Sequence, residues 1–437
     1  MRNTDYFKNK KVTIVGFARS GLTAANLLYD LGAKVSVTDN KDNETTRLNA
    51  AKLKSKEICF ELGGHNREVI QNSDFVILSP GVPAHAQPVV WAKEFGVRII
   101  SEIELAYILC PATIIAVTGS NGKTTTTILI SKVLEASGRK VWTCGNIGNP
   151  FSGEVQKMAE GDYVCLEVSS FQLETIDKFK PKISVILNFS RNHLDWYSNM
   201  QEYLDAKARI FLNQEKEDYL VLNRGDAVLR DLAKKAKAKI AFFEQEQGFN
   251  SNQSAVIAVG NILGIKKEAA LKVFQDFKGV EHRQECVARI NGIKFINDSK
   301  ATTVESAMWA LESILEPIIW IAGGRDKGLD YSLIRDLALR KVKNLILIGE
   351  AKEKIRKVFD GALSMRDANT LEEAVGAAFR GARPGDAVLL SPMCSSYDMF
   401  KDYEERGRQF KEIVFKLAQK RGIENSSDFC VIASERK

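Results

Sequence analysis

A glycine-rich turn places a lysine and a threonine at a spacing that suits phosphate binding. Its residues are Gly119, Ser120, Asn121, Gly122, Lys123 and Thr124, which fit the GxxGK(S/T) variant of the phosphate loop. The turn follows an apolar strand-like run and opens a helical pattern, which is the context that this motif requires. Backbone amides would wrap the phosphates, Lys123 would reach the terminal phosphates, and the Thr124 hydroxyl would bind Mg²⁺. The turn predicts a nucleoside triphosphate site; the alternative is a glycine-rich turn with a chance lysine.

Two further candidates follow later strand-like runs of the same region. Glu167 ends an apolar run, and carboxylates at the carboxyl ends of parallel strands border the ligand crevice. It reads either as a Mg²⁺ ligand or as a strand-end carboxylate in solvent or in a salt bridge. His193 comes just after the run that ends at Asn188, and its imidazole could bind metal. An isolated loop histidine is more often structural, so this side chain alone predicts little.

Lys207 lies within the apolar stripe of an expected helix from Met200 to Asn213, for which Asn199 is the expected N-cap. A lysine in that stripe is out of place, because lysine is seldom buried without a partner. Either its side chain reaches solvent along the apolar surface, or it has a special role. A lysine held neutral by burial can act as a nucleophile or react with CO₂.

Three polar loops follow strand-like runs in the last third of the chain. They are residues 297–302 (Asn-Asp-Ser-Lys-Ala-Thr), 323–327 (Gly-Gly-Arg-Asp-Lys) and 391–396 (Ser-Pro-Met-Cys-Ser-Ser). The first can reach a ligand or simply cap a helix through Asp298 or Ser299. The second resembles an anion-binding turn. All three would lie at the carboxyl ends of strands, where a ligand of a parallel sheet is expected.

Near the N-terminus, Gly16-x-Ala18-x-x-Gly21 is a degraded dinucleotide fingerprint, with Asp39 at 23 residues after Gly16. Ala18 replaces the glycine that lets the backbone approach a pyrophosphate. The pattern is a weak signal for nicotinamide binding, and a nucleotide bound in a different pose is equally compatible.

Apolar strand-like runs alternate with helical patterns, which predicts an α/β fold with parallel sheets. We expect three domains: an N-terminal Rossmann-like domain (1–103), a central P-loop mononucleotide-binding domain (104–281) and a C-terminal Rossmann-like domain (282–437). The expected strands are 11–15, 34–38, 75–78, 113–117, 163–168, 183–188, 293–297, 318–322, 345–349 and 387–390.

Composition narrows the class of protein. The 437 residues carry a net charge of +7, with 45% hydrophobic and 27% charged residues, as in a soluble globular protein. The mild basic excess fits acidic ligands such as nucleotides, but without a dense basic run it does not indicate a nucleic-acid partner. The seven cysteines form no CxxC pair, so we expect mostly free thiols rather than a zinc site or a disulfide framework. No apolar run reaches membrane-spanning length and no signal core is seen, so we expect a cytoplasmic protein.

Taken together and in order, these motifs resemble the Mur ligase family. The segments that carry the resemblance are 118–125, 167–170, the His193 segment, 205–209, His282-Arg283 and 297–302, within a match from about Val12 to about Phe410. The segment from Leu390 to Ser396, followed by Asp398 and Phe400-Lys401, is similar to the D-glutamate-adding branch. The DNPR-type signature of the diaminopimelate- or lysine-adding branch is absent.

The resemblance implies an ATP-dependent ligase that joins D-glutamate to UDP-N-acetylmuramoyl-L-alanine through an acyl phosphate in peptidoglycan precursor synthesis. We expect it to act as a monomer. It implies that the sugar nucleotide is bound by Arg19, Ser20, Asp39, Gly81 and Asn146. ATP would be bound by residues 119–124, Thr125, Arg283, Asp298 and Lys300. A metal site for two Mg²⁺ ions would use Thr124, Glu167, His193 and a carbamylated Lys207. D-Glutamate would be bound by Thr302, Lys327, Ser396 and Tyr403, the last standing where the family has phenylalanine.

Three rival hypotheses remain open at this point. The same ligase chemistry could act on another amino acid, as in another Mur ligase or a folylpolyglutamate synthase. The first block could serve a nicotinamide-dependent oxidoreductase, although Ala18 and the separate phosphate loop argue against this. A non-catalytic nucleotide switch would leave Glu167, His193 and Lys207 without a common purpose.

Overall fold

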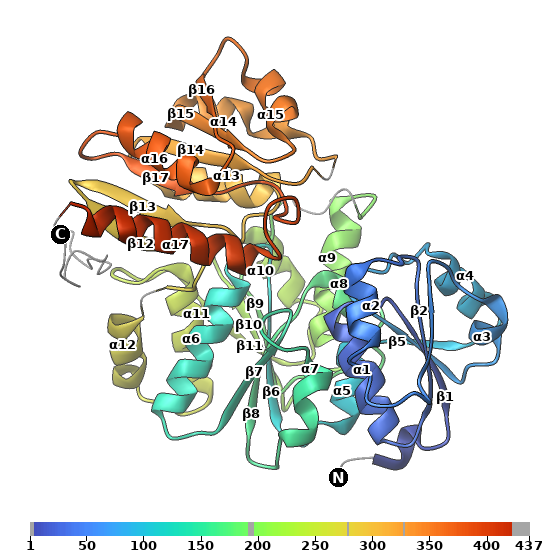
Figure 1. Cartoon of the computed structure of the whole chain (residues 1–437). Helices are drawn as coiled ribbons and strands as arrows, with labels where there is room; N and C mark the ends of the chain where they lie inside the picture. Colours follow the sequence, from blue (N-terminus) through green and yellow to red (C-terminus); the bar gives the residue numbers. More distant parts are fainter. Residues whose placement is uncertain (1–3, 191–195, 278, 327, 422–437) are drawn as a thin grey trace. The chain divides into compact units, whose positions relative to one another are not determined.

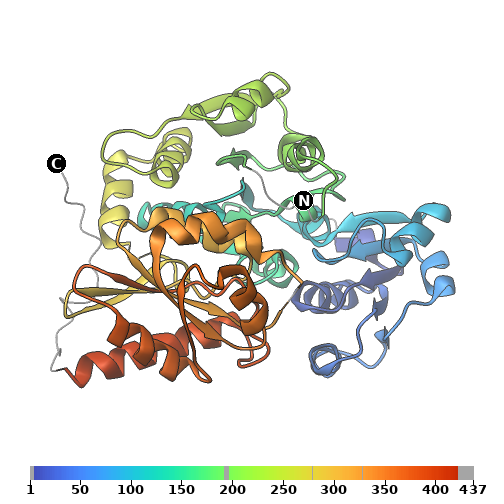
Figure 2. The ribbon, with the colours of Figure 1, turned by 90° about the horizontal axis from the view of Figure 1, so that it is seen from above.

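A computed structural model describes most of the chain and divides it into two compact units. The described residues are 4–190, 196–277, 279–326 and 328–421. The first unit is Met1–Asp276 and the second is Phe277–Lys437, and each is described here by itself. Two sheets belong to the first unit and one to the second. Helices lie against both faces of the sheets (Figures 1 and 2).

The first sheet is entirely parallel and has the strand order β3-β2-β1-β4-β5. Its strands are β1 Lys11–Val15, β2 Lys34–Asp39, β3 Cys59–Leu62, β4 Phe75–Leu78 and β5 Arg98–Ser101. The helical elements are η1 Thr4–Phe7, α1 Arg19–Asp30, α2 Glu44–Ala50, α3 Arg67–Gln71, α4 Gln87–Glu94 and α5 Glu102–Leu109. The chain runs outward from β1 in both directions, so the order reverses at β1. Ligands of open α/β sheets bind at the carboxyl edge beside such a reversal.

The second sheet is also parallel, with the order β11-β10-β9-β6-β8-β7. Its strands are β6 Thr113–Thr118, β7 Val141–Gly145, β8 Tyr163–Glu167, β9 Ile183–Ile186, β10 Tyr219–Asn223 and β11 Lys239–Phe243. The helical elements are α6 Lys123–Ala136, α7 Phe151–Glu154, η2 Val155–Lys157, α8 Ser170–Leu173, α9 Met200–Ala208, η3 Arg209–Phe211, α10 Ala227–Ala233, α11 Ser251–Ile262 and α12 Lys267–Asp276. Here β6 lies at the reversal, between β8 and β9. The carboxyl ends of these three strands therefore surround the phosphate loop.

The third sheet has the order β12-β13-β17-β14-β15-β16, and β12 is antiparallel to its neighbour. Its strands are β12 Glu285–Ile290, β13 Ile293–Asn297, β14 Ile318–Gly323, β15 Val342–Ile348, β16 Ser364–Asp367 and β17 Ala387–Leu390. The helical elements are α13 Val304–Ser313, η4 Tyr331–Ile334, α14 Arg335–Lys341, α15 Lys352–Phe359, α16 Leu371–Gly381 and α17 Tyr403–Gln419. Two hydrophobic clusters cover opposite faces: one includes Trp320 with residues of α13 to α15, the other Ile321 with residues of α16 and α17. Alternate side chains of β14 thus serve opposite faces.

The α/β fold class predicted from the alternating pattern is confirmed, and each expected strand is present. Several bounds were wrong, and two of them lie close to the phosphate loop. The run expected to reach Asn188 is a strand only to Ile186, and the helix expected to reach Asn213 is α-helical only to Ala208. There the chain tightens into a 3₁₀ turn, where the Ser184 hydroxyl donates to the Ile210 carbonyl at 3.1 Å. Edge strands such as β3 and β16 were missed because their side chains are mostly exposed and show no apolar run.

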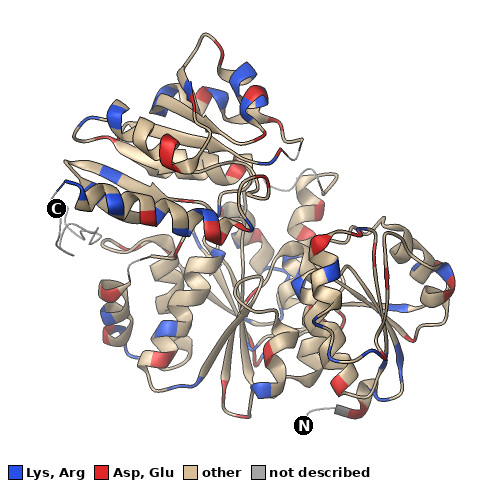
Figure 3. Cartoon of the chain, viewed as in Figure 1, with Lys and Arg blue, Asp and Glu red and all other residues tan. Residues whose placement is uncertain are grey.

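Acidic and basic residues are interspersed along the ribbon of both units (Figure 3). Within the described residues, no helix has the combination of length and apolar composition needed to cross a membrane. Of the cysteines, Cys144, Cys165 and Cys394 are buried free thiols, whereas Cys59 is exposed.

Candidate active site

The glycine-rich turn after β6 has the backbone shape of a phosphate loop. Gly119 and Gly122 adopt φ values of +152° and +80°, which side-chain-bearing residues rarely adopt. Gly122 is the N-cap of α6 and provides no side-chain cap, so the first amides of this 14-residue helix stay available for an anion. The turn therefore offers both loop amides and the positive end of a helix at the carboxyl edge of the sheet.

Two lysines that are far apart in sequence meet at one carbonyl of this loop. Lys123 Nζ donates to the carbonyl oxygens of Gly119 and Ser120, each at 2.9 Å. Lys207 Nζ, from α9, donates to the same Gly119 oxygen at 2.9 Å and lies 4.5 Å from the ring centre of Tyr203. Lys207 is only 1% exposed, so its side chain does not reach solvent. Burial, with a smaller contribution from the Lys123 ammonium, lowers the pKa of Lys207 far below its usual value.

Hard oxygen atoms beside the loop lack partners within the described residues. The Glu167 carboxylate ends β8, next to β6, in register with Val117. Its Oε1 accepts a hydrogen bond from Asn146 Nδ2 at 2.8 Å, but its buried Oε2 has no hydrogen-bond partner there. The buried Thr124 hydroxyl also has none. Buried polar atoms are normally hydrogen-bonded, so these two oxygens mark a place for a ligand or a cation.

The chain that follows β9 holds the loop from its other side. Asn188 Oδ1 accepts from the Asn121 amide at 2.9 Å, and its Nδ2 donates to the Asn121 carbonyl at 3.1 Å. The Ser120 hydroxyl accepts from the Ser190 amide at 3.0 Å. The sequence reasoning missed Asn188 as a functional residue. Its signal was present, because a polar residue closing an apolar run lies at the ligand edge of the sheet.

His193 was predicted to join this site, but it lies outside the described residues. The segment resumes at Trp196 and Tyr197, whose side chains both donate to Glu174 Oε1, at 3.2 and 2.6 Å. The stacked rings of Phe171 and Tyr197 add to this anchor. The chain on the carboxyl side of His193 is thus fixed to α8.

The glycine loop of the first sheet is organised by a carboxylate. Asp39, at the end of β2, accepts from the Phe17 amide at 2.6 Å and from the Lys41 amide at 2.8 Å. Gly21 must lack a side chain, since a Cβ there would lie 2.1 Å from the Gly16 carbonyl oxygen. Ala18, the N-cap of α1, offers no side-chain hydrogen bond, so this helix also begins with free amides. The loop can hold an anion at the helix start, while one of its amides is already taken by Asp39.

Two other predicted residues of this region have definite neighbours. The Arg19 guanidinium donates to the Gly148 carbonyl, which belongs to the loop after β7. Gly81 is exposed in the turn after β4 and donates its amide to the Ser79 carbonyl at 2.9 Å. Ser20 lies in the first turn of α1. Arg19 and Ser20 follow β1 and Gly81 follows the neighbouring strand β4, so these residues border the carboxyl edge of the first sheet.

In the second unit, the three predicted polar loops meet as expected. The amide of Asp298 donates to the Leu390 carbonyl at 2.8 Å, and that of Met393 donates to the Ala301 carbonyl at 2.9 Å. The Gly323 amide donates to the Pro392 carbonyl at 2.8 Å, which ties the third loop to the other two. Parallel pairing of β13, β17 and β14 brings these loops to one edge.

Asp298 has an unusual setting in this group. Its Oδ2 accepts from the Ser391 hydroxyl at 2.8 Å and its Oδ1 from the Gln284 amide at 3.2 Å. Burial raises the pKa of Asp298 to about 7, although these hydrogen bonds and Arg283 oppose the shift. Lys300 Nζ lies 5.8 Å from the ring centre of Tyr403, the first residue of α17. Perturbed titration at a ligand edge is typical of functional sites.

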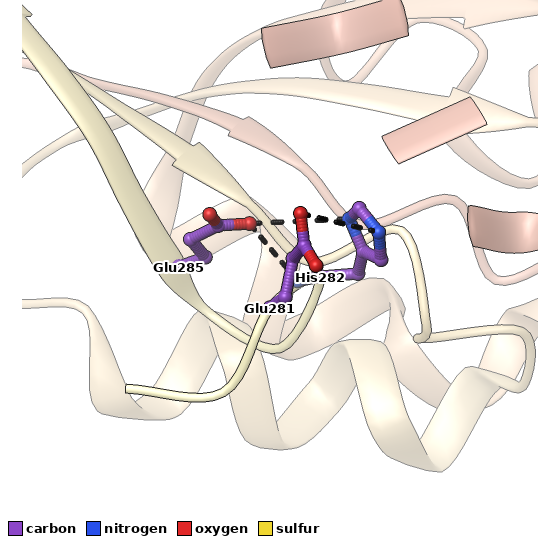
Figure 4. Close-up of side chains that lie close together, drawn as sticks. All are labelled: Glu281, His282 and Glu285. Carbon is purple, nitrogen blue, oxygen red and sulfur yellow. Dashed lines mark hydrogen bonds and ion pairs between the residues drawn. The ribbon is translucent and has the colours of Figure 1, made fainter. Parts of the chain in front are cut away.

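The loop that carries Arg283 is anchored by an ion-paired cluster of Glu281, His282 and Glu285 (Figure 4). One possible ligand atom from each lies within 4.8 Å of the others. Lys411 Nζ donates to Glu281 at 2.8 Å and lies 2.6 Å from Glu285, so an ammonium group already balances the carboxylates. Lys411 lowers the pKa of Glu281, and burial lowers that of His282. We therefore interpret the cluster as a structural contact that fixes the Arg283 loop to α17, rather than as a metal site.

The His282 ring fits against a glycine of α17. A Cβ at Gly407 would lie 2.2 Å from His282 Nδ1, so only glycine allows the approach. Asn297 Nδ2 lies 3.0 Å from the same nitrogen, and the His282 carbonyl accepts from the Lys300 amide at 3.0 Å. The Arg283 loop and the Asn297–Lys300 turn are therefore one hydrogen-bonded structure.

A buried arginine beneath these loops was missed by sequence reasoning. Arg406 is fully buried and donates to the Ser299 hydroxyl and carbonyl, both at 2.9 Å, and to the Cys394 carbonyl at 3.2 Å. Burial lowers its pKa to about 10. The sequence pattern that drew attention to Lys207 is also present here, because Arg406 is a charged residue in the apolar stripe of α17, with Phe410 and Val414. Arg406 fixes the loop after β17 to the turn after β13.

Of the predicted amino-acid contacts, Ser396 is buried in the loop after β17 and Thr302 lies in the turn before α13. The Tyr403 carbonyl accepts from the Ser299 hydroxyl at 2.9 Å. Lys327 lies outside the described residues. The described members of this set come from the three loops at one edge of the third sheet and from the start of α17.

The geometry defines a class of protein: parallel α/β sheets with a phosphate loop, a buried lysine and unpaired carboxylate and hydroxyl oxygens at the carboxyl edge of the middle sheet. Comparisons with known proteins agree. The Mur ligase MurD-like N-terminal domain matches residues 10–101, the Mur ligase middle domain 117–281, and the Mur ligase glutamate ligase domain 282–394. The chain therefore belongs to the Mur ligase family.

Two relatives that are 40% and 41% identical to this chain share one name. A UDP-N-acetylmuramoylalanine–D-glutamate ligase of Thermoanaerobacter pseudethanolicus is 40% identical, with 94% of this chain and 99% of the relative covered. The ligase of the same name from Geotalea uraniireducens is 41% identical, with 94% and 98% covered.

Solved structures support the fold. The UDP-N-acetylmuramate–alanine ligase MurC of Thermotoga maritima matches with a TM-score of 0.57 at 19% identity, covering 93% of this chain and 100% of that one. A bifunctional folylpolyglutamate synthase/dihydrofolate synthase of Yersinia pestis matches with a TM-score of 0.54 at 16% identity, covering 70% and 90%. At such identities the likeness shows the fold alone.

Proposed function

We propose that this chain is a cytoplasmic ATP-dependent ligase that joins D-glutamate to UDP-N-acetylmuramoyl-L-alanine during peptidoglycan precursor synthesis. The observation that carries the proposal is the meeting of Lys123 and Lys207 on the Gly119 carbonyl, beside the unpaired oxygens of Glu167 and Thr124. The shared name of the 40–41% identical relatives supports the choice of substrates. In this proposal residues 1–103 bind the sugar nucleotide, 104–281 bind ATP, and 282–437 bind D-glutamate.

ATP would be held by the amides of residues 119–125 and by the start of α6. Lys123 Nζ donates to two carbonyls of the loop, at 2.9 Å each. A terminal phosphate would compete for this ammonium, because charge-assisted bonds to anions are stronger than bonds to carbonyls. The family resemblance also assigns Arg283, Asp298 and Lys300 to ATP binding.

The residues present fit a Mg²⁺ site. Mg²⁺ binds hard oxygen donors, and the unpaired Glu167 Oε2 and Thr124 hydroxyl are such donors. His193 would complete the set. When bound, Mg²⁺ would neutralise charge that develops on the transferring phosphoryl group. Asn146, which donates to Glu167 Oε1 at 2.8 Å, would keep the second carboxylate oxygen directed toward the metal.

Lys207 would serve as a carbamate. Its lowered pKa favours the neutral amine, which is the form that attacks CO₂. A bond forms between Nζ and the carbon, one C=O π pair moves to oxygen, and one proton leaves the nitrogen. The product is an anionic oxygen donor that suits a second Mg²⁺ ion. This modification would remove the unfavourable burial of a cation beside Lys123.

The reaction begins with transfer of the γ-phosphoryl group of ATP to the alanyl carboxylate, which gives an acyl phosphate. A carboxylate needs this step because it is a poor electrophile without a good leaving group. Lys123 and the loop amides would stabilise the charge on the phosphoryl oxygens. The D-glutamate amine then attacks the acyl carbon, and phosphate leaves from a tetrahedral intermediate. Closure around the ligands would exclude water from the acyl phosphate.

D-Glutamate would be bound by Thr302, Ser396, Tyr403 and Lys327. The described members come from loops that hydrogen bonds join into one edge. Arg406 would act beneath them as a positioning residue, because its guanidinium donates to Ser299 and Cys394.

A phosphate-release panel tests this proposal. Purified protein should release phosphate from ATP only when UDP-N-acetylmuramoyl-L-alanine and D-glutamate are both present. Replacing D-glutamate with L-lysine, diaminopimelate or L-glutamate should reduce the rate to background. Equal rates with one of these amino acids would overturn the assigned substrate, and NAD(P) binding by calorimetry would favour the oxidoreductase instead.

A further inference from the structure

One short segment touches both the sugar-nucleotide loop and the Glu167 carboxylate. Residues 145–152 connect the end of β7 to the start of α7. Both ends of the segment lie within the first unit. Figure 1 shows α7 beside α1, and the two helices are in contact. The segment has no role in the proposed chemistry beyond Asn146.

At its first end, the segment is joined to Glu167. Asn146 donates its amide to the Glu167 carbonyl at 2.9 Å and its Nδ2 to the Glu167 carboxylate at 2.8 Å. Gly145 has φ +103°, and a Cβ there would come within 2.4 Å of the Glu167 carbonyl oxygen. Backbone therefore packs directly on backbone, and any shift of the segment moves the residue that orients the carboxylate.

At its other end, the segment is joined to α1, which begins at the sugar-nucleotide loop. Arg19 donates to the Gly148 carbonyl, and the hydroxyls of Thr23 and Ser152 share a hydrogen bond of 2.8 Å. The Ser152 amide donates to buried Glu102 Oε1 at 2.6 Å. These contacts link α1 and α5 to one turn of the segment.

We propose that residues 145–152 couple occupancy of the sugar-nucleotide loop to the orientation of Glu167, so that Mg-nucleotide binding is tightened once the UDP-sugar is bound. The inference rests on the proposed function of both loops. An anion at the start of α1 would bind Arg19 and the first amides of the helix. Binding would change the hydrogen bond that Arg19 donates to the Gly148 carbonyl. The Thr23–Ser152 bond keeps α1 and the segment together, and Asn146 passes the displacement to Glu167.

Coupling of this kind is reciprocal, so it can be measured from either ligand. The test uses full-length protein and compares the affinity for Mg-AMPPCP, a non-hydrolysable ATP analogue, with and without saturating UDP-N-acetylmuramoyl-L-alanine. For the unchanged protein we expect the affinity to rise about fivefold or more, the lower end of typical coupling. Ser152→Ala removes the hydroxyl bond to Thr23, together with the hydrogen bond of the same hydroxyl to Glu102, and leaves the bonds of Thr23 within α1 intact. Thr23→Val removes the same bond from the other side, together with the bonds of its hydroxyl to the Arg19 and Ser20 carbonyls.

Both variants should bring the affinity ratio to within about twofold of one, and the double variant should do no more than either single variant, since the Thr23–Ser152 bond is already absent in each. The matched control is Thr13→Val, which removes a hydroxyl bond of 2.7 Å to Ser73 in the same sheet, away from the segment. Its ratio should stay at the value of the unchanged protein. Melting temperatures of the three single variants show whether a changed ratio reflects general destabilisation.

Retention of the ratio in Ser152→Ala and Thr23→Val, with both ligands bound, would overturn the coupling and leave the proposed function intact. An equal loss in Thr13→Val would also overturn it. Failure of the unchanged protein to bind UDP-N-acetylmuramoyl-L-alanine would instead refute the proposed function, and the coupling with it.

Discussion

The chain has two glycine loops of similar architecture, one after β1 and one after β6. Each follows the strand at which its sheet order reverses, and each opens a helix whose N-cap makes no side-chain hydrogen bond. They differ in what surrounds the loop. At the first, Asp39 already occupies the Phe17 amide. At the second, Lys123 and Lys207 converge on the Gly119 carbonyl.

This difference suits the first loop to binding an anion and the second loop to phosphoryl transfer. A carboxylate that fixes a loop suits a ligand whose charge does not change, such as the diphosphate of a sugar nucleotide. The Lys123 ammonium and the unpaired oxygens of Thr124 and Glu167 suit a phosphoryl group whose charge is redistributed in the transition state. Similar loop geometry therefore does not imply similar chemistry, and the neighbouring side chains decide between the two.

The largest effect is expected at the second loop. Lys123→Met should lower kcat by on the order of 10²–10³-fold, because it removes a charged donor to the transferring phosphoryl group. The change should leave the KM for UDP-N-acetylmuramoyl-L-alanine within about twofold, since that ligand is assigned to the first loop. Steady-state phosphate release measures both values. An unchanged kcat would show that the two loops do not differ as proposed.

Lys207→Ala should also abolish most activity, and short carboxylates such as acetate or formate should restore part of it. Their anionic oxygens would replace those of the proposed carbamate in the space left by the side chain. The control is Lys123→Met, which should not respond to the same carboxylates. A folded Lys207→Ala protein that shows no recovery would argue against carbamylation.

Asp39→Asn should have a smaller effect, and it should act on KM rather than on kcat. Hydrogen bonds to charged groups contribute about 1.5–3 kcal/mol, so the KM for the UDP-sugar should rise about tenfold while kcat changes little. Asp42→Asn, which removes an exposed ion pair with Arg47 a few residues away, is the control and should change neither value measurably. A loss of kcat without a change of KM in Asp39→Asn would mean that the first loop also takes part in the chemistry.

The smallest effect concerns stability where the two sheets of the first unit meet. Burial raises the pKa of Glu102 above its usual value. A carboxyl group with a raised folded-state pKa binds its proton more tightly in the folded state. Its contribution to stability is therefore full below the unfolded pKa of about 4.3 and is lost as the pH rises.

Glu102→Gln cannot ionise, so this variant does not lose stability as the pH rises. It keeps an oxygen that can accept a hydrogen bond from the Ser152 amide. Its melting temperature should match that of the unchanged protein near pH 4 and exceed it by about 2–4 °C near pH 8. Calorimetry across this range tests the sign. A lower melting temperature at pH 8 would show that the carboxylate is stabilised in its charged form.

Much of the fold and part of the candidate site could be predicted from the sequence. Buried parallel strands such as β6 and β14 are apolar on both faces, so they appear as continuous runs. The exposed edge strands β3 and β16 lack that signal and were missed. Lys207 was found because a charged residue interrupts an apolar stripe. Arg406 interrupts the stripe of α17 in the same way, but no loop motif lies next to it in sequence to draw attention.

Local sequence by itself determined the phosphate loop, its glycines and the helix that follows, since these depend on backbone conformation and neighbouring residues. The order of recognisable motifs determined the family. Only the tertiary structure decided that Lys207 reaches a carbonyl 88 residues away, that Asn146 directs one oxygen of Glu167, and that Thr23 meets Ser152. Those contacts depend on which strands are neighbours and how helices pack on them. Strand order and helix packing follow from burial summed over the whole chain, so no short segment specifies them.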